Sequence, residues 1–319
     1  MKGLREPPAD YAGTLPHPPK LAGKRDEDRA GVVGLPARVE RLGKARRQAQ
    51  AVYTYLTGAG SASVRTPADR ARVAALGRCA SWLQFRHWLH HDEVRLHAAD
   101  FCRQSMLCQA CAVRRSGKLA GQFLPKIEAV VASAPTTILA FLTLTIRNRS
   151  DLEDAFRHLT SSFLVLRDRG RDQRKKGRGA SEFRKVAGYV ASIEITHNGK
   201  GWHPHMHLIV ALDRYVDQRA LSAEWLGITG DSRIVDIRQV DRSDPMNAVA
   251  ELLKYQLKFS TMTPGRVWEA ASVLRGRRLL SSAGVFWGIK EPEVLTDEPL
   301  DGPFRDYLYR WLDGCGYSL

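Results

Sequence analysis

The sequence lacks a long uninterrupted hydrophobic run. Its most apolar stretch, IEAVVASAPTTILAFLTLTI, is broken by Glu128 and Pro135, so it is more typical of a helix end, a turn and a buried strand than of a membrane span. The beginning, MKGLREPPADYAGTLPHPPK, has no apolar segment of the kind that a secretory signal contains. We therefore expect a cytoplasmic protein with no membrane partner.

Acidic residues are few: 34 Asp and Glu stand against 49 Lys and Arg, which gives a net charge of +15. An excess of this size favours a polyanionic partner, most often nucleic acid. A soluble basic protein without such a partner is the alternative. Cysteines are also few, at five, and in a cytoplasmic protein they are more often metal ligands or free thiols than disulfides.

The chain has 319 residues, 44% of them hydrophobic, which is enough for a sizeable core. We find no internal repeat. Residues 1–70 are rich in Pro, Gly, Ala and basic residues, and we expect a largely flexible basic arm with one helix around VERLGKARRQAQAVYTYL. Residues 75–132 form a Cys-rich segment whose closing helix should be kinked or interrupted at Pro125. Residues 266–319 form a C-terminal extension without a readable motif.

Residues 135–265 show the most regular pattern. Strands are predicted at TILAFLTLTIRN, VAGYVASIEIT, HPHMHLIVAL and SRIVDIRQV. Helices are predicted at SDLEDAFRHLTSSFLVLRDRG, DQRALSAEWLG and DPMNAVAELLKYQLKF, with Ser150 and Asp244 as N-caps and Pro245 in first position. The order β-α-β-β-α-β-α predicts an α+β fold with a ferredoxin-like (RRM-like) antiparallel sheet and helices on one face.

Three histidines alternate in NGKGWHPHMHLIVAL: His203, His205 and His207. Because side chains alternate along a strand, the three imidazoles share one face. Glu194 lies on the preceding strand, across a turn that begins at Asn198-Gly199. A two-residue turn would place it opposite His203, and a longer loop would shift it toward His205 or His207.

Two imidazoles and one carboxylate with open positions make a site for a divalent metal. The alternative is a polar sheet face whose histidines are satisfied by ordinary hydrogen bonds.

The helix around ELLKYQLKF carries a candidate nucleophile. Its apolar stripe consists of Val249, Leu252, Leu253 and Leu257. Tyr255 and Glu251 fall off this stripe, four residues apart and therefore neighbours on the helix surface. A phenol flanked by Lys254 and Lys258 can attack phosphorus. The alternative is an amphipathic helix with a surface tyrosine.

The ordered set FLTLTIRN, GWHPHMHLIV and ELLKYQLKF resembles the HUH endonucleases, and in particular the rolling-circle replication initiators (Rep proteins) of bacterial plasmids. Upstream, CRQSMLCQACAVRRSGK is similar to the region before the catalytic domain of that family. The resemblance covers roughly residues 75–290 and makes residues 135–265 the HUH catalytic domain.

The resemblance implies Mg²⁺ or Mn²⁺ on His205 and His207, with Glu194 assigned as third ligand and His203 as a ligand or a substrate contact. Tyr255 would attack origin DNA, single-stranded or extruded as a cruciform. The products would be a 5′-phosphotyrosyl intermediate and a 3′-OH primer, used with a host helicase and polymerase.

Closing the cycle needs a second attack, for which many relatives use a second tyrosine. We see no strong second tyrosine, since Tyr189 should point to the apolar side of its strand. Glu251 stands one turn before Tyr255, as in the Glu-x-x-x-Tyr pattern of this plasmid branch, and would activate water for a final hydrolysis.

Cys102, Cys108 and Cys111 follow C-x₅-C-x₂-C, and either Cys79 or His97 would complete a tetrahedral structural zinc (Zn²⁺) site. The resemblance favours Cys79. The alternative is a set of buried free thiols. The basic residues that follow would lie near the DNA backbone: Arg114 and Arg115.

Two other interpretations stay open. One is a conjugative relaxase or single-tyrosine transposase with the same metal core, although the position of Tyr255 after the histidines argues against a relaxase. The other is a zinc-containing DNA-binding regulator that cuts nothing.

Overall fold

Two antiparallel sheets organise the computed structural model, which describes residues 34–319 except 178, 198, 254–261, 289 and 291. The first part of the chain forms α1 (Leu35–Thr57), α2 (Pro67–Arg78), β1 (Trp82–Trp88), β2 (Glu93–Ala99) and α3 (Gln109–Ser133). The middle part forms β3 (Ile138–Thr145), α4 (Leu152–Lys176), β4 (Val186–His197), β5 (Trp202–Leu212), α5 (Gln218–Thr229), β6 (Val235–Gln239) and α6 (Met246–Leu252). The last part forms α7 (Pro264–Val273), β7 (Leu280–Gly284), β8 (Phe304–Leu312) and β9 (Gly316–Ser318).

The larger sheet has five strands in the order β6-β3-β5-β4-β7. β5 lies in its centre because both of its edges are paired, with β3 on one side and β4 on the other. On one face of β5, Met206, Leu208 and Val210 are almost completely buried. The mixed α+β class predicted from the sequence is therefore confirmed.

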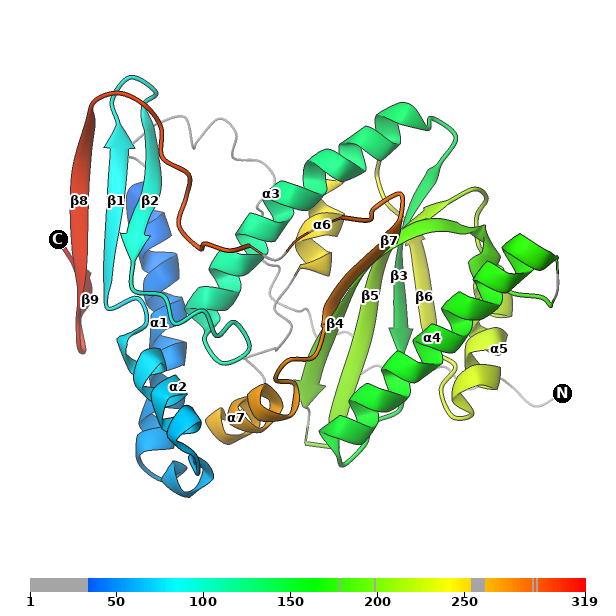
Figure 1. Cartoon of the computed structure of the whole chain (residues 1–319), viewed down its shortest axis with the longest axis horizontal. Coiled ribbons are helices and arrows are strands. Elements are labelled where there is room, and N and C mark those ends of the chain that lie inside the picture. Colours follow the sequence, from blue (N-terminus) through cyan, green and yellow to red (C-terminus); the bar gives the residue numbers. More distant parts are fainter. Residues whose placement is uncertain (1–33, 178, 198, 254–261, 289, 291) are drawn as a thin grey trace, which may run out of the picture.

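Helices cover both faces of this sheet, whereas the sequence predicted helices on one face only. α4 and α5 pack on the face of Met206 and Leu208 (Figure 1). On the opposite face, α3 and α6 form a second core with Ile209 and Ala211, at the end of β5 that follows the histidines. α3 continues through Pro125 without a break, so the expected interruption there is wrong.

The smaller sheet joins the two ends of the described chain. Its strand order is β2-β1-β8-β9, with Trp82 to Trp88 of β1 paired against Phe304 to Arg310 of β8. Residues 266–319 are therefore not an appendage, since they complete a sheet that β1 and β2 begin. Sequence patterns could not reveal this pairing because it joins strands more than 200 residues apart.

Within residues 1–70 the structure describes residues 34–70, and these contain the helix that the sequence predicts around VERLGKARRQAQAVYTYL. α1 is a 23-residue helix that buries a regular apolar stripe: Leu35, Val39, Leu42, Ala45, Ala49, Val52 and Leu56. α2 follows with a capping box in which Thr66 and Asp69 satisfy each other's backbone N–H groups.

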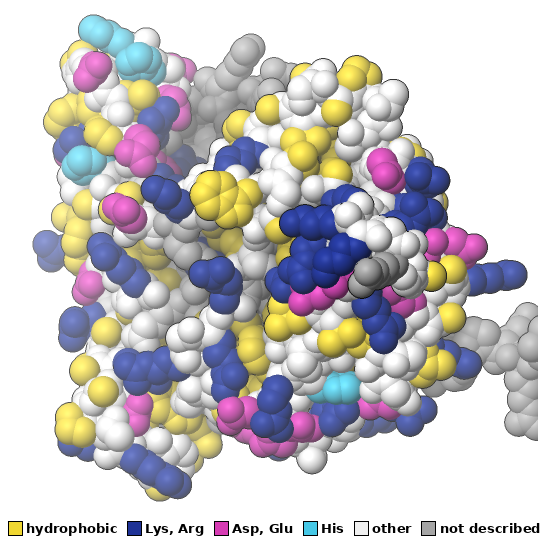
Figure 2. Space-filling model, turned by 45° about the vertical axis from the view of Figure 1, so that its right-hand side comes forward, with side chains coloured by type: hydrophobic (Ala, Val, Ile, Leu, Met, Phe, Trp, Pro, Cys, Tyr) yellow, Lys and Arg dark blue, Asp and Glu magenta, His cyan; other side chains and the backbone are white. Residues whose placement is uncertain are grey.

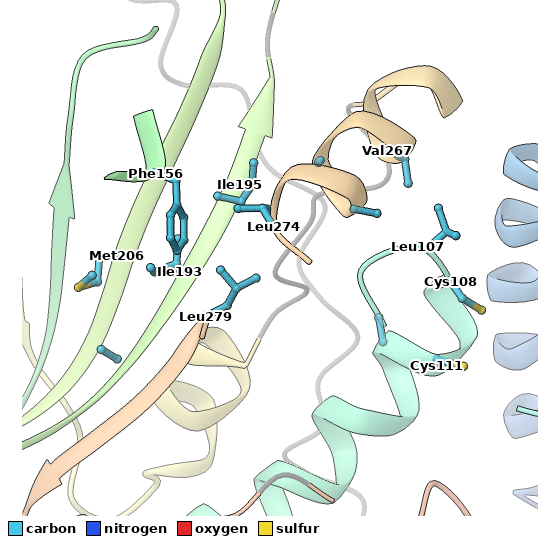
Figure 3. Close-up of a cluster of buried hydrophobic side chains, with 14 of the residues drawn as sticks. Leu107, Cys108, Cys111, Phe156, Ile193, Ile195, Met206, Val267, Leu274 and Leu279 are labelled. Atoms are coloured by element: carbon cyan, nitrogen blue, oxygen red, sulfur yellow. The ribbon is translucent and has the colours of Figure 1, made fainter. Parts of the chain in front are cut away.

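α7 connects the larger sheet to the cysteine segment. Figure 3 shows this helix between the strand that carries Ile193 and Ile195 and the start of α3. Leu274, which follows α7, belongs to the same buried cluster as Ile195 and Leu107. The cysteine segment and the sheet thus share one continuous hydrophobic core.

Two predicted helix starts shift by one residue. Asp151, not Ser150, is the N-cap of α4, because its carboxylate accepts the backbone N–H of Asp154 at 2.7 Å. Pro245, not Asp244, occupies the N-cap position of α6, and Asp244 instead accepts from the Asn247 side chain. None of the described helices combines the length and apolar character that crossing a membrane requires.

Candidate active site

Register places the predicted carboxylate beside the central histidine. Glu194 on β4 pairs with His205 on β5, and the neighbouring pairs are Thr196 with His203 and Ser192 with His207. The two strands separate after the pair His197 and Trp202, so the connection is longer than a two-residue turn. The sequence left several pairing registers of these two strands open. The structure has a register with the longer loop, in which Glu194 lies opposite His205.

His207 is held on both sides. Its Nε2 lies 3.2 Å from Glu194 Oε2, and its Nδ1 lies 3.1 Å from the hydroxyl of Thr143 on β3. Adjacent ligands of a cation with bonds of about 2.1 Å are separated by about 3 Å. The Nε2 and carboxylate atoms therefore have the spacing of two neighbouring metal ligands, and Thr143 is the group that orients the ring from behind.

The other two histidines follow along the same face of β5. The ring centroids of His203 and His205 are 4.2 Å apart, and those of His205 and His207 are 6.0 Å apart with nearly parallel planes. Burial lowers the pKa of His203, so this imidazole is neutral near pH 7 and keeps a lone pair. Its Nδ1 is buried and accepts no hydrogen bond from the described residues.

α6 lies on the same face of the sheet as the histidines. The Phe141 ring is 5.6 Å from the His207 ring, and the Arg238 guanidinium lies 5.0 Å from the centroid of Phe141. Arg238 in turn donates a hydrogen bond to the carboxylate of Glu251 on α6. A continuous row of contacts thus joins Glu251 to the histidine face.

Arg238 is a residue of this site that the sequence interpretation missed. The signal was present in SRIVDIRQV, because Val235 and Ile237 are buried and Asp236 and Arg238 must then share the other face. Asp236 pairs with Thr143 and Arg238 with Phe141, so these two side chains stand beside the histidine patch.

The predicted nucleophile lies outside the described residues, as do Lys254, Lys258 and Leu257. Tyr255 follows the last residue of α6 by three positions. The preceding part of the predicted apolar stripe is buried, with Val249 at 0%, Leu252 at 1% and Leu253 at 5% exposure.

Four cysteines converge in the N-terminal part. The Sγ atoms of Cys79, Cys102, Cys108 and Cys111 all lie within 4.8 Å of one another. Neighbouring pairs are 3.4 to 3.6 Å apart, close to the roughly 3.8 Å expected for four thiolates around a tetrahedral zinc with 2.3 Å bonds. Cys79, not His97, is the fourth member of the group.

Local structure explains how these thiols meet. Cys79 caps the end of α2, Cys102 follows β2, and Cys108 and Cys111 begin α3. Hydrogen bonds with the Cys108, Cys111 and Cys79 thiols lower the pKa of Cys102, while hydrogen bonds with Cys102, Cys111 and Cys79 raise the pKa of Cys108. A cation bound among the four sulfur atoms would stabilise their thiolate forms.

The two arginines after this cluster have different surroundings. Arg114 donates to Asp297 at 2.6 Å and to the carbonyl of Leu295 at 2.8 Å, so it ties α3 to the chain before β8. The expected contact of Arg114 with the DNA backbone stays a prediction. Arg115 lines a cleft beside the cluster.

Comparison with known proteins gives the family. The model of the family Rep_1, described as Replication protein, matches residues 93–302. These residues include the strands β2 to β7 and the helix α3 with its cysteines. The chain belongs to this family of replication proteins. The relationship to Rep proteins predicted from the three sequence stretches is thereby confirmed.

Individual relatives are more distant. The chain is similar to a Protein rep of Streptococcus pneumoniae serotype 2 (strain D39 / NCTC 7466), with 29% identity over 182 residues, 52% of this chain and 53% of that protein. It is also similar to a Protein rep of Lactiplantibacillus plantarum, with 27% identity over 247 residues, 69% of this chain and 74% of that protein. The chain thus spans about half the length of the pneumococcal relative. No solved structure matched the chain.

Proposed function

We propose that this replication protein nicks origin DNA by metal-assisted attack of Tyr255, and so starts rolling-circle replication. One observation carries the proposal: Glu194, His205 and His207 share one patch of the sheet, with His207 Nε2 3.2 Å from the Glu194 carboxylate. Two imidazoles and a carboxylate that converge in this way are suited to Mg²⁺ or Mn²⁺.

The topology supports assigning residues 135–265 to an HUH catalytic domain. The elements β3-α4-β4-β5-α5-β6 form a sheet segment ordered β6-β3-β5-β4. This element order supports a ferredoxin-like fold, in which the elements follow β-α-β-β-α-β. The histidines lie on its central strand, where neighbouring strands can supply Glu194 and Thr143.

Each residue of the patch has a role toward the cation and the phosphate. Glu194, His205 and His207 would hold the metal, and His203 is placed to ligate or to contact the substrate. When bound, Mg²⁺ or Mn²⁺ polarises a phosphoryl oxygen and stabilises the charge that builds on it. Thr143 fixes the His207 ring, and the neutral imidazole of His203 needs no proton release before it can bind.

The covalent step is a transesterification. The Tyr255 oxygen forms a bond to phosphorus while the bond from phosphorus to the 3′ oxygen breaks. Water takes up the phenol proton and supplies one to the released 3′ oxygen, which becomes a hydroxyl. One DNA end is then a 5′-phosphotyrosyl ester and the other a 3′-OH primer, with Lys254 and Lys258 assigned to the phosphate backbone.

Glu251 is proposed to close the cycle by activating water, which hydrolyses the phosphotyrosyl ester and frees the protein. The hydrogen bond from Arg238 to the Glu251 carboxylate supports this role because it fixes the carboxylate on the histidine side of α6. The Glu251→Ala variant should nick normally and accumulate the covalent adduct. Normal release in this variant would remove Glu251 from the mechanism.

The cysteine cluster is proposed to hold a structural Zn²⁺ through Cys79, Cys102, Cys108 and Cys111. It joins α2, the chain after β2 and α3, so its role is to fix this segment against the sheet. The expected partners are origin DNA and the host helicase and polymerase that extend the 3′ end.

The proposal is tested with labelled origin DNA, as a single strand, and Mn²⁺ on a denaturing gel. The wild type should give a protein-linked band that Tyr255→Phe and His207→Ala both abolish. His97→Ala is the matched control, since it removes a histidine outside the patch and should keep the band. DNA binding with neither nick nor adduct in the wild type would favour the alternative, a DNA-binding regulator.

A further inference from the structure

A cleft of about 1000 Å³ lies between the cysteine segment and the larger sheet. One wall is the chain from Arg103 to Leu107 and the start of α3, and the other is the chain from Leu274 to Ser282, with Trp287 at the rim. On the face drawn in Figure 2, Lys and Arg side chains gather along the hollow between the two halves of the molecule. His203, His205 and His207 are not among the residues that line this cleft, so its charge requires a separate explanation.

The lining is strongly cationic. It contains seven Lys and Arg residues and a single carboxylate, Glu293. Within the described part of the chain, the guanidinium groups of Arg103, Arg275 and Arg278 form no ion pair, and all three residues are exposed. Cations gathered without counter-charges favour binding of a polyanion.

Two other arginines of the lining, Arg277 and Arg72, show the contrast. Arg277 pairs with Glu153 at 2.6 Å, and Arg72 stacks on Trp268 at 4.9 Å and donates to Gln104. Burial and then the nearby charge of Arg275 lower the pKa of Arg72. Arg72 and Arg277 are therefore engaged with other side chains of the protein. The guanidinium groups of Arg103, Arg275 and Arg278 remain available to a ligand.

The rim adds an aromatic surface. Trp287 is 78% exposed, so the face of its indole is accessible to a ligand. The turn that carries it is fixed, because Lys126 donates to the Trp287 carbonyl at 2.9 Å. An indole beside free guanidinium groups suits a nucleic acid whose bases are accessible for stacking, which is the state of a single strand and not of a duplex.

The cleft also lies next to the histidine face. Leu280 and Ser282 of β7 line the cleft, and Leu280 pairs with Ser192 of β4, two residues before Glu194. Side chains of Ser192 and Glu194 point to the same face. From β5 across β4 to β7 is two strand spacings, about 10 Å, a length that one or two nucleotides of an extended strand can cover.

We propose that this cleft is a second nucleic-acid site, which holds single-stranded DNA through its phosphates on Arg275, Arg278 and Arg103 and through a base stacked on Trp287. It rests on the proposed function in one respect: the strand held here is the continuation of the strand that the histidine patch takes. The cleft itself makes and breaks no covalent bond.

Binding is measured in the Tyr255→Phe background, where no cleavage occurs, by fluorescence anisotropy of a labelled single strand of about 15 nucleotides. The double variant Arg275→Ala/Arg278→Ala should weaken binding roughly tenfold and reduce the salt dependence by about two released ions. Trp287→Ala should weaken it by roughly tenfold as well, and Trp287→Phe should restore most of the loss.

The matched control is Arg305→Ala/Arg310→Ala on β8, which removes the same charge from exposed positions outside the cleft. It should change binding less than about twofold. Cleft variants that bind like this control would overturn the proposal, as would an equal loss for a duplex of the same length. Because the assay needs no cleavage, its failure leaves the adduct test untouched, and failure of the adduct test leaves this measurement readable.

Discussion

At the scale of single residues, the histidine patch depends on neighbouring side chains that the spacing of the histidines in the sequence does not identify. The alternation of His203, His205 and His207 is visible in the sequence, and it fixes their common face. The partner of each ring nitrogen is not visible there, because Thr143 comes from a strand about 60 positions earlier and meets His207 only through the pairing of β3 with β5. Orientation of a ligand is therefore a tertiary property.

Thr143→Val tests that orientation. Loss of the hydroxyl leaves His207 Nδ1 without its partner, so Mn²⁺ affinity and metal-dependent nicking should each fall by about 10- to 100-fold while the fold is kept. Isothermal titration with Mn²⁺ measures the first effect. Thr145→Val is the control, since its hydroxyl bonds the Ile234 carbonyl at 3.0 Å instead. Equal effects of the two variants would show that Thr143 has no special role.

Asp297 makes stability depend on pH. Burial alone would raise its pKa, but Arg114 and Arg38 together hold the pKa below its ordinary value of 3.8. A carboxyl with a lowered pKa stabilises the fold above its unfolded pKa, and this contribution is lost as pH falls through the folded value.

Asp297→Asn should therefore lower the free energy of unfolding by roughly 2 kcal/mol at pH 7. The difference from the wild type should shrink as pH is lowered below about 4. Urea unfolding at several pH values measures it, with the exposed Asp301→Asn as control. A difference that is constant from pH 7 to pH 3 would contradict the ion-pair explanation.

At the scale of elements, the sequence predicted strands and helices most accurately where the periodicity of hydrophobic residues matches the burial of their side chains. The alternation in TILAFLTLTIRN and HPHMHLIVAL located β3 and β5, and the order of strands and helices up to α6 is as predicted. The N-cap of α4 lies one residue later than predicted because the Asp151 carboxylate, and not the Ser150 hydroxyl, accepts the backbone N–H of Asp154. α7 and β8 were missed because their apolar faces are defined by partners far away in the sequence.

The cysteine elements give a prediction of their own. Cys102→Ser should remove the zinc, about one per chain by metal analysis, and lower the melting temperature by more than about 5 °C, because the site ties α2 to α3. Cys315→Ser is the matched control, since Cys315 is exposed and lies outside the cluster. A Cys102→Ser protein that keeps its zinc and its melting temperature would leave the cluster as four free thiols.

At the scale of the whole molecule, the last strands complete the first sheet and reach the cysteine cluster. Trp311 of β8 lies 5.2 Å from the guanidinium of Arg46 on α1, and Arg46 donates to the carbonyl of Cys79. Residues from α1, α2 and β8 thus meet around one buried arginine. The sequence could not predict this arrangement, since each segment alone shows only an ordinary amphipathic pattern.

A pair of tryptophans tests that arrangement. Trp311→Ala should cost about 2 kcal/mol of unfolding free energy, because it removes an aromatic group packed on Arg46 and Tyr317. Trp287→Ala, the same change at a 78% exposed position, should cost less than about 0.5 kcal/mol. Chemical unfolding separates the two. Equal losses would mean that β8 contributes little to the N-terminal sheet.

The central claim is that the histidine patch and the tyrosine after α6 act on one phosphate. It is tested most directly by mass mapping of the covalent product formed with origin DNA and Mn²⁺. We predict that the nucleotide is found on the peptide containing Tyr255, joined through its 5′ phosphate, and that chelation of the metal prevents its formation. A nucleotide on any other residue, or an adduct that forms equally well without metal, would contradict the account.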